Sequence, residues 1–114
     1  MAADSSDIAH VRTEGAAQVV TVHGDVDMHR SPALHQVLLD VMESRPRMLV
    51  VDLAGVAYMD SSGVGTLVDC FRRVKESKAK MTLVGLQPRV RGVFEITKLD
   101  QFFTIRDTVA EALP

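Results

Sequence analysis

The spacing of hydrophobic residues changes several times along the chain, most clearly between residues 48 and 77. Residues 48–53 form a nearly unbroken apolar run, which is typical of a β-strand covered on both faces. From Val64 onward the apolar residues recur at i, i+3, i+4, i+7 and i+10, the spacing of one face of a helix. This segment therefore predicts a buried strand, a short loop and an amphipathic helix that ends near residue 77.

The segments on either side predict further strands and helices. Residues 18–23 are rich in β-branched side chains, and a short link joins them to a candidate strand at residues 8–12, so we expect an antiparallel hairpin at one edge of the sheet. Ser31 and Pro32 predict the start of a helix, with Ser31 as the N-cap and Pro32 at the first helical position. Strands are also predicted at residues 80–85 and 102–105, and helices from residue 88 and over residues 108–113.

Strands that alternate with helices at this spacing predict an α/β layer with right-handed crossover connections. The length of 114 residues fits one domain. We expect the polar, acidic residues 1–7 to form a mobile tail and residues 8–114 to form a single domain.

Composition and charge narrow the range of partners. Hydrophobic residues make up 46% of the chain and charged residues 25%, as in an ordinary globular protein. The net charge is −2 and the basic residues form no single run, so we expect no direct contact with nucleic acid, which needs a concentrated basic surface. No apolar stretch approaches the roughly 20 residues of a spanning helix, which argues against membrane insertion. A single cysteine and a polar N-terminus unlike a secretory signal predict a cytoplasmic protein.

Few residues suggest chemistry of their own. Asp25, Asp27, Asp52 and Asp60 lie at predicted strand ends or in the loops that follow them, where they form either a paired-acid site or ordinary caps and turns. The four histidines share no metal-ligand spacing, so we expect no metal. Cys70 falls in the middle of a predicted helix, where a lone cysteine is usually a small buried hydrophobe. Because P-loop, G-x-G-x-x-G and G-x-S-x-G motifs are absent too, we expect no cofactor and no enzymatic activity.

The loop between the buried strand and its helix carries an acid, two hydroxyls and a glycine. Asp60 or Ser61 is expected to cap the helix, because a short side-chain oxygen there can accept from the free amides of the first turn. The hydroxyls of Ser61 and Ser62 then stand at the positive end of the helix dipole. Gly63 and Gly65 are expected to leave one side of the first turn bare, so that another protein can approach the backbone closely. The loop is either a helix cap and nothing more, or a place where charge is added and removed.

Two stretches of the chain resemble a known family. Residues 50–53 and 58–67 resemble the core motif of the STAS domain, in the anti-sigma factor antagonist type that comprises the bacterial anti-anti-sigma factors. Residues 22–27 resemble the Gly-Glu-Leu-Asp loop of that family, with Asp25 in place of the usual Glu. The likeness covers about residues 8–112. It implies the STAS fold, a central mixed β-sheet of about five strands flanked by about four α-helices.

The resemblance also implies a function. In this family the unphosphorylated antagonist binds an anti-sigma factor that is also a serine kinase, and a sigma factor is thereby released. Phosphorylation of a serine in the loop ends the complex, and a PP2C-type phosphatase resets the cycle. Carried over to this chain, the acceptor is Ser62, with Ser61 as the alternative. The implied partner surface comprises Asp25, Asp27, Asp60, Ser61, Gly63 and Gly65.

Other functions stay open at this point. Residues 28–32 depart from the more usual pattern of the family, which leaves the identity of the anti-sigma factor undecided. One alternative is a STAS interaction module of another assembly, such as a lipid-transport complex or a stressosome-like scaffold, without a kinase cycle. Another is a nucleotide-binding protein or an enzyme that uses the acids near Asp60. Co-purified partners and calorimetry with nucleotides distinguish these alternatives.

Overall fold

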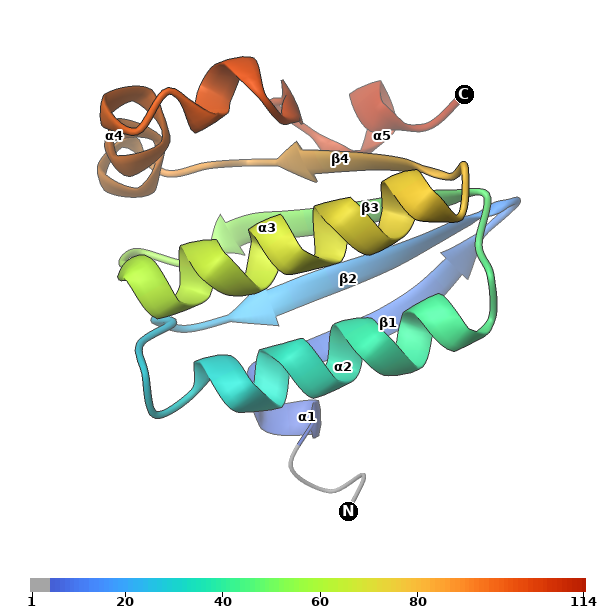
Figure 1. The fold of residues 1–114 in the computed structure, drawn as a ribbon, viewed down its shortest axis with the longest axis horizontal. Helices are drawn as coiled ribbons and strands as arrows, with labels where there is room; N and C mark the ends of the chain where they lie inside the picture. Colours follow the sequence, from blue (N-terminus) through green and yellow to red (C-terminus); the bar gives the residue numbers. More distant parts are fainter. Residues whose placement is uncertain (1–4) are drawn as a thin grey trace.

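A five-stranded mixed β-sheet forms the centre of the molecule (Figure 1). The computed structural model describes residues 5–114. The strands lie side by side in chain order: β1 (Ala9–Glu14), β2 (Ala17–His23), β3 (Met48–Gly55), β4 (Lys80–Val84) and β5 (Thr104–Arg106). β1 is antiparallel to β2, whereas each later strand is parallel to the one before it. The predicted α/β fold, with a mixed sheet and a hairpin at its edge, is confirmed.

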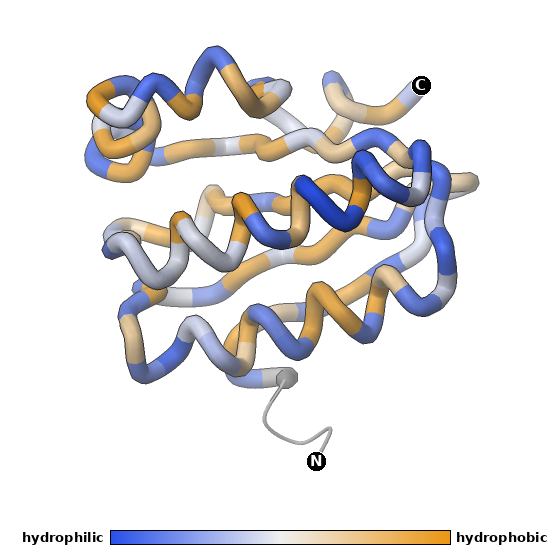
Figure 2. The backbone as a smooth tube through the Cα atoms, viewed as in Figure 1, coloured by the Kyte–Doolittle hydropathy of each residue, from blue (hydrophilic) through white to orange (hydrophobic). Residues whose placement is uncertain are grey.

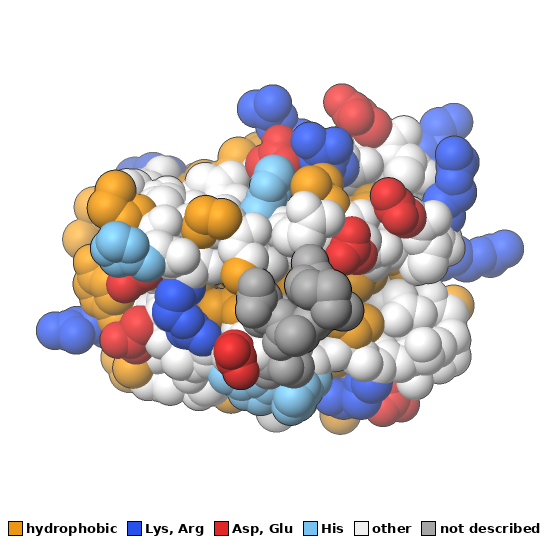
Figure 3. All heavy atoms as spheres, turned by 90° about the horizontal axis from the view of Figure 1, so that it is seen from below, with side chains coloured by type: hydrophobic (Ala, Val, Ile, Leu, Met, Phe, Trp, Pro, Cys, Tyr) orange, Lys and Arg blue, Asp and Glu red, His pale blue; other side chains and the backbone are white. Residues whose placement is uncertain are grey.

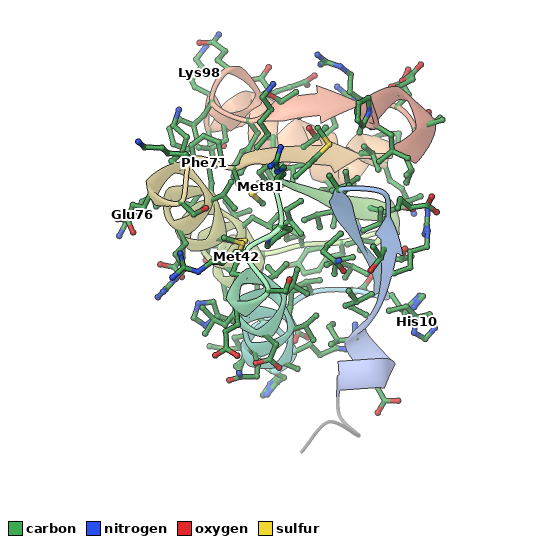
Figure 4. All side chains as sticks on the ribbon, turned by 90° about the vertical axis from the view of Figure 1, so that its right-hand side faces the viewer. His10, Met42, Phe71, Glu76, Met81 and Lys98 are labelled. Carbon is green, nitrogen blue, oxygen red and sulfur yellow. The ribbon has the colours of Figure 1, made fainter. Side chains whose placement is uncertain are left out.

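Two long helices cover one face of the sheet. α2 (Ser31–Glu43) and α3 (Ser61–Glu76) pack against each other on this face, and α1 (Ser5–Ile8) contacts α2. α4 (Pro88–Ile96) and the short 3-10 helix η2 (Leu99–Gln101) connect β4 to β5. α5 (Val109–Ala112) packs on the opposite face, as the side view in Figure 4 shows.

β3 runs through the centre and buries side chains on both faces. Leu49, Val51 and Leu53 belong to the main core beneath α2 and α3. Val50 belongs instead to a small cluster that includes Ala112 of α5. Because successive side chains of a strand point to opposite faces, burial on both sides accounts for the unbroken apolar run of this segment. Along α2 and α3, by contrast, hydrophobic and hydrophilic positions alternate (Figure 2).

The start of α2 differs from the prediction. The helix begins at Ser31 with Arg30 as its N-cap, and no side chain caps it there. The side chain of Asp27 instead accepts hydrogen bonds from the amides of His29 (2.9 Å) and Arg30 (3.1 Å), and the Asp27 carbonyl accepts from the Ser31 amide (2.8 Å). An Asp side chain that bonds the backbone two residues later supports a turn. The amides of Ala33 and Leu34, which the hydroxyl of a capping Ser31 would serve, donate instead to the Arg30 carbonyl (3.1 and 3.3 Å). Pro32 is therefore the second helical residue, one position later in the helix than predicted, and still lies in the first turn.

The last strand begins later than predicted. Phe102 and Phe103 precede β5 rather than belonging to it, because they pack in an aromatic cluster. The Phe103 ring lies 5.2 Å from that of Phe71 and 5.6 Å from that of Phe94, between centroids.

Most of the predicted N-terminal tail, residues 1–4, lies outside the described residues. Residues 5–7 form a single helical turn together with Ile8, whose side chain is buried in the main core. Within residues 5–114, no helix is both long and apolar enough to cross a membrane.

Candidate functional site

The two sequence motifs meet at one edge of the sheet. β2 and β3 are parallel, so the loops that follow them leave from the same edge. Val26 forms a parallel bridge with Met59: its amide donates to the Tyr58 carbonyl (3.0 Å), and its carbonyl accepts from the Asp60 amide (3.1 Å). The acidic loop of residues 24–30 is therefore tied directly to the serine loop.

Asp60 is the N-cap of α3, one of the two residues predicted for this role. Its Oδ1 atom accepts from the amides of Ser62 (2.9 Å) and Gly63 (3.4 Å), and also from the Ser62 hydroxyl (2.5 Å). The hydrogen bond from the Ser62 hydroxyl is the largest of the causes that lower the pKa of Asp60 below its ordinary value, and the two amides add to it. The capping carboxylate of Asp60 therefore also fixes the position of the Ser62 hydroxyl through a hydrogen bond.

Ser61 and Ser62 stand in different surroundings. Ser61 is exposed, whereas Ser62 is partly buried with its hydroxyl bonded to Asp60. Ser62 also lines an open groove between the two long helices, which we call the α2–α3 groove. The groove is lined by Ser31, Pro32 and His35 of α2 and by Ser62, Gly65, Thr66, Asp69 and Arg73 of α3.

The two glycines of the first turn also differ, and the expectation that both leave it bare is correct only for Gly65. Gly65 is exposed, and a Cβ atom there would have no neighbour within 4 Å. Gly63 is buried, and a Cβ atom there would lie 2.6 Å from Cγ of Met59 and 2.9 Å from Cγ1 of Val26. Residues two apart on a helix do not share a face, so Gly63 lets α3 pack onto the loops while Gly65 stays open to the outside.

Farther along the α2–α3 groove lies an ionic cluster that the sequence analysis missed. Asp69 accepts from Nε of Arg73 (2.9 Å) and lies 2.8 Å from Nε2 of His35, between side-chain atoms. The hydrogen bond from Arg73, followed by that from His35, lowers the pKa of Asp69. The i,i+4 spacing of Asp69 and Arg73 is readable in the sequence; the contact with His35 depends on how the two helices pack.

The structure brings three of the four predicted aspartates to this edge. Asp25 and Asp27 lie on the loop of residues 24–30, beside the loop that carries Asp60. Asp52 does not join them: it lies within β3, two residues after Val50 and hence on the face that carries α5. Its side chain accepts from the Ala54 amide (3.0 Å), so a paired-acid site that includes Asp52 is not assembled.

Arg30, which the sequence analysis also missed, holds the acidic loop in place. Its guanidinium donates to the carbonyl oxygens of His23 (2.8 Å), Asp25 and Asp7 (3.1 Å). Three carbonyls from two different segments are thereby satisfied by one side chain.

Two large hydrophobic side chains flank the site. Met28 is 68% exposed on the acidic loop, and Tyr58 is 40% exposed just before Asp60. Acidic, basic, histidine and hydrophobic side chains lie close together at the left of Figure 3. Exposed apolar groups rimmed by charge are typical of protein-interaction surfaces.

Cys70 behaves as a buried hydrophobe, as predicted. It is 2% exposed, and burial raises the pKa of its thiol to about 12. Among residues 5–114, no group of three or more His, Cys, Asp or Glu side chains is arranged to hold a metal ion.

The sequence of the chain was compared with known protein families and with individual proteins. The STAS domain family matches residues 8–112. The chain belongs to the STAS domain family. This STAS domain is 30% identical over 92 residues to the anti-sigma-B factor antagonist of Listeria monocytogenes, covering 81% of each chain.

Solved structures agree with this assignment. An anti-sigma factor antagonist from Mycobacterium paratuberculosis is similar with a TM-score of 0.85 and 29% identity, covering 91% of this chain and 88% of that chain. The antagonist SpoIIAA in its unphosphorylated form, at 21% identity, shares the fold with a TM-score of 0.78, covering 91% of each chain. The phosphorylated form, from Bacillus, has a TM-score of 0.72 at 20% identity, covering 91% of this chain and 95% of that chain.

The family resemblance and the fold predicted from the sequence are both confirmed. The relatives are named as antagonists of anti-sigma factors, that is, as regulators and not as enzymes.

Proposed function

We propose that this STAS domain, in its unphosphorylated form, binds an anti-sigma factor serine kinase in the cytoplasm and so releases a sigma factor. Phosphorylation of Ser62 ends the complex, and a PP2C-type phosphatase restores the bare serine. The observation that carries the proposal is the hydrogen bond between Ser62 and the capping Asp60, at the edge where the acidic loop and the serine loop are tied together.

Several features support Ser62 as the acceptor over Ser61. The Ser62 hydroxyl is held in one orientation by Asp60, and it lines the α2–α3 groove, which is open to a partner. Ser61 is exposed at the helix start and remains the alternative acceptor. A phosphate on either residue stands near a helix N-terminus, where the dipole tolerates an anion.

The switch follows from charge and desolvation. A phosphate adds about −1.5 to −2 charges to a surface that already carries Asp25, Asp27 and Asp60. In the complex this charge loses water and meets the acids by which a kinase holds its metal and nucleotide. A hundredfold loss of affinity corresponds to only about 2.7 kcal/mol, a magnitude that one misplaced phosphate can supply.

The partner surface is proposed to combine acids with apolar anchors. Asp25, Asp27, Asp60, Ser61 and Gly65 contribute the polar part and the open backbone, whereas the buried Gly63 acts by shaping the turn. Met28 and Tyr58 supply apolar contact area beside them, as large side chains do at interaction hot spots.

Incubation with the cognate kinase and ATP, followed by phosphosite mapping and pull-down, tests the proposal. We expect modification at Ser62, release of the wild-type chain, and retention of the Ser62→Ala variant on the kinase whether or not ATP is present. Ser61→Ala is the matched control and is expected to be modified and released like the wild type. Modification only at Ser61, or co-purification with a transporter ATPase in place of a kinase, contradicts it.

A further inference from the structure

A second pocket lies at the end of the sheet away from Ser62. It has a volume of about 520 Å³ and is bounded by the last turns of α3, the start of β4, the turn before β5, and α5. Figure 4 views the molecule from this end and labels Phe71 on α3 and Met81 on β4, both of which line the pocket. Its volume lies within the range of about 300–1,000 Å³ that is usual for small-molecule sites.

The pocket exists because the sheet is incomplete at this corner. β5 pairs only with residues Thr82–Val84 of β4. Lys80 and Met81, at the start of β4, therefore have no neighbouring strand on that side. α5 is only four residues long, so it leaves much of the opposite face uncovered near this gap.

One wall of the pocket is aromatic and aliphatic. The rings of Phe71 and Phe102 lie 4.5 Å apart, between centroids, and Met81 lies beside them in the lining. Phe102 is 47% exposed although it belongs to this cluster. An exposed phenyl ring at the mouth of a concave site offers apolar area to a ligand.

The rest of the pocket is rich in positive charge. Lys75, Lys80 and Arg106 line it, and within residues 5–114 none of them forms an ion pair. Glu111 is the one carboxylate among the lining residues, and its Oε1 atom accepts from the Asp107 amide (3.0 Å). The Lys75 ammonium lies 5.8 Å from the centroid of the Phe71 ring, so cationic and aromatic groups share one wall.

We propose that this pocket binds a small amphipathic anion, a single carboxylate or phosphate group attached to an apolar chain. Lys80 and Arg106 lie on the α5 face by the alternation of β4 and β5, whereas Phe71 lies on the α3 face. The head group pairs with Lys80 and Arg106, and the chain passes the open corner of the sheet to lie along Phe71 and Phe102. Three cations against one carboxylate favour an anion over a neutral or cationic ligand. The thirteen residues from Ser62 to Lys75 correspond to about 20 Å along α3, so the site is separate from the proposed phosphorylation site and does not depend on it.

Calorimetry and NMR titration of the full chain test the proposal with four probes: decanoate, decyl phosphate, decanol and inorganic phosphate. We expect both amphipathic anions to shift the amide resonances of Phe71, Lys75, Met81 and Thr104. Decanol and inorganic phosphate are each expected to bind at least about tenfold more weakly, since each lacks one half of the recognised chemistry. The stronger of the two anions identifies the head group, a carboxylate or a phosphate.

Paired charge reversals locate the head group. Lys80→Glu is expected to weaken binding of the anions by about tenfold, from one attractive contact turned repulsive. Arg72→Glu makes the same charge change on an exposed position of α3 that does not line the pocket, and it is expected to leave affinity unchanged. Equal binding of decanol and decanoate, equal effects of the two reversals, shifts confined to other residues, or self-association through this face overturns the proposal.

Discussion

At the residue scale, the site depends on a single carboxylate oxygen. Oδ1 of Asp60 accepts hydrogen bonds from the amides of Ser62 and Gly63 and from the Ser62 hydroxyl. A phosphoryl group on Ser62 removes the hydroxyl donor and brings a second anion to the same place. The cap and the proposed acceptor are therefore coupled, and Asp60 influences both helix stability and the state of Ser62.

Because Asp60 caps α3 as a carboxylate, we expect the thermal stability of the protein to depend on pH. Because the folded-state pKa of Asp60 is lowered from the ordinary 3.8, its carboxylate stabilises the folded protein above that pH. This contribution is lost as the pH falls through the lowered pKa. Asp60→Ala is expected to reduce the thermal midpoint at pH 7 by several degrees, measured by circular dichroism.

Asp60→Asn is the matched control, since an amide oxygen can still cap the helix but does not titrate in this range. Its thermal midpoint is expected to fall less than that of wild type between pH 5 and pH 2. A wild-type advantage over Asp60→Asn that stays constant across this range contradicts the assignment.

The two glycines of α3 provide a matched pair of substitutions. Gly63→Ala places a methyl group against Met59 and the rigid side chain of Val26, and overpacking of this kind is expected to lower the free energy of unfolding by about 1–2 kcal/mol. Gly65→Ala meets nothing within 4 Å and gains up to about 1 kcal/mol of helix propensity. Urea denaturation measures both, and equal effects of the two changes contradict the packing described here.

The residue scale also shows where sequence reasoning is limited. An N-cap at Asp60 or Ser61 was predictable because a cap depends on neighbours within three residues. The buried position of Gly63 was not, because only the folded loops bring Val26 and Met59 against it. The contact between His35 and Asp69 joins residues 34 positions apart and depends on the packing of α2 on α3.

At the element scale, two sets of hydrogen bonds fix the acidic loop, those of the Val26 backbone and those of the Arg30 guanidinium. Backbone bonds of Val26 join it to the serine loop, while the Arg30 guanidinium reaches the carbonyls of His23, Asp25 and Asp7. The sequence predicted a polar loop here, with no sign that one of its basic residues organises it. The predicted start of the last strand was also wrong, because tertiary packing decides it: Phe103 packs in the aromatic cluster and does not belong to β5.

Replacement of Arg30 is expected to loosen this loop without unfolding the sheet. Arg30→Met leaves carbonyl oxygens without their donor, at an expected cost of about 1–2 kcal/mol in the free energy of unfolding. Arg30→Lys keeps the charge but lacks the planar fork that reaches several carbonyls at once, so it is expected to restore only part of the loss. Hydrogen exchange checks this, with faster exchange expected at the amides of Val26 and Asp60. Unchanged exchange at these two amides contradicts the role of Arg30.

At the scale of the whole molecule, the proposed switch stands on a rigid support. α2 and α3 pack on the sheet over a continuous aliphatic core, and Ser62 lies at the rim of this core, not inside it. This arrangement was predictable in outline, because alternating strands and helices specify the layers. The sequence alone did not predict the open corner beside β4, since it arises from how few residues β5 pairs with.

A switch of this kind is expected to act through surface charge and not through a change of fold. Amide resonances that shift on phosphorylation are therefore expected to cluster in the first turn of α3, the loop of residues 24–30 and the loop before Asp60. The phosphorylated chain is expected to bind its kinase about a hundredfold more weakly, or about 2.7 kcal/mol. Shifts spread across β4 and β5 contradict a purely local effect.

Salt separates the electrostatic part of this loss from the desolvation part. The screening length falls from about 10 Å at 0.1 M salt to about 3 Å at 1 M, so repulsion from the surrounding acids weakens as salt is added. The affinity gap between the two forms is expected to narrow with salt but not to close, because a phosphate covered by the partner still loses its water. Titration of both forms against the kinase between 0.05 M and 0.5 M salt measures the gap, with Ser62→Asp as an intermediate charge state. A gap that is absent at every salt concentration contradicts the proposed switch, whereas one that is insensitive to salt assigns the whole effect to desolvation and none to Asp25, Asp27 and Asp60.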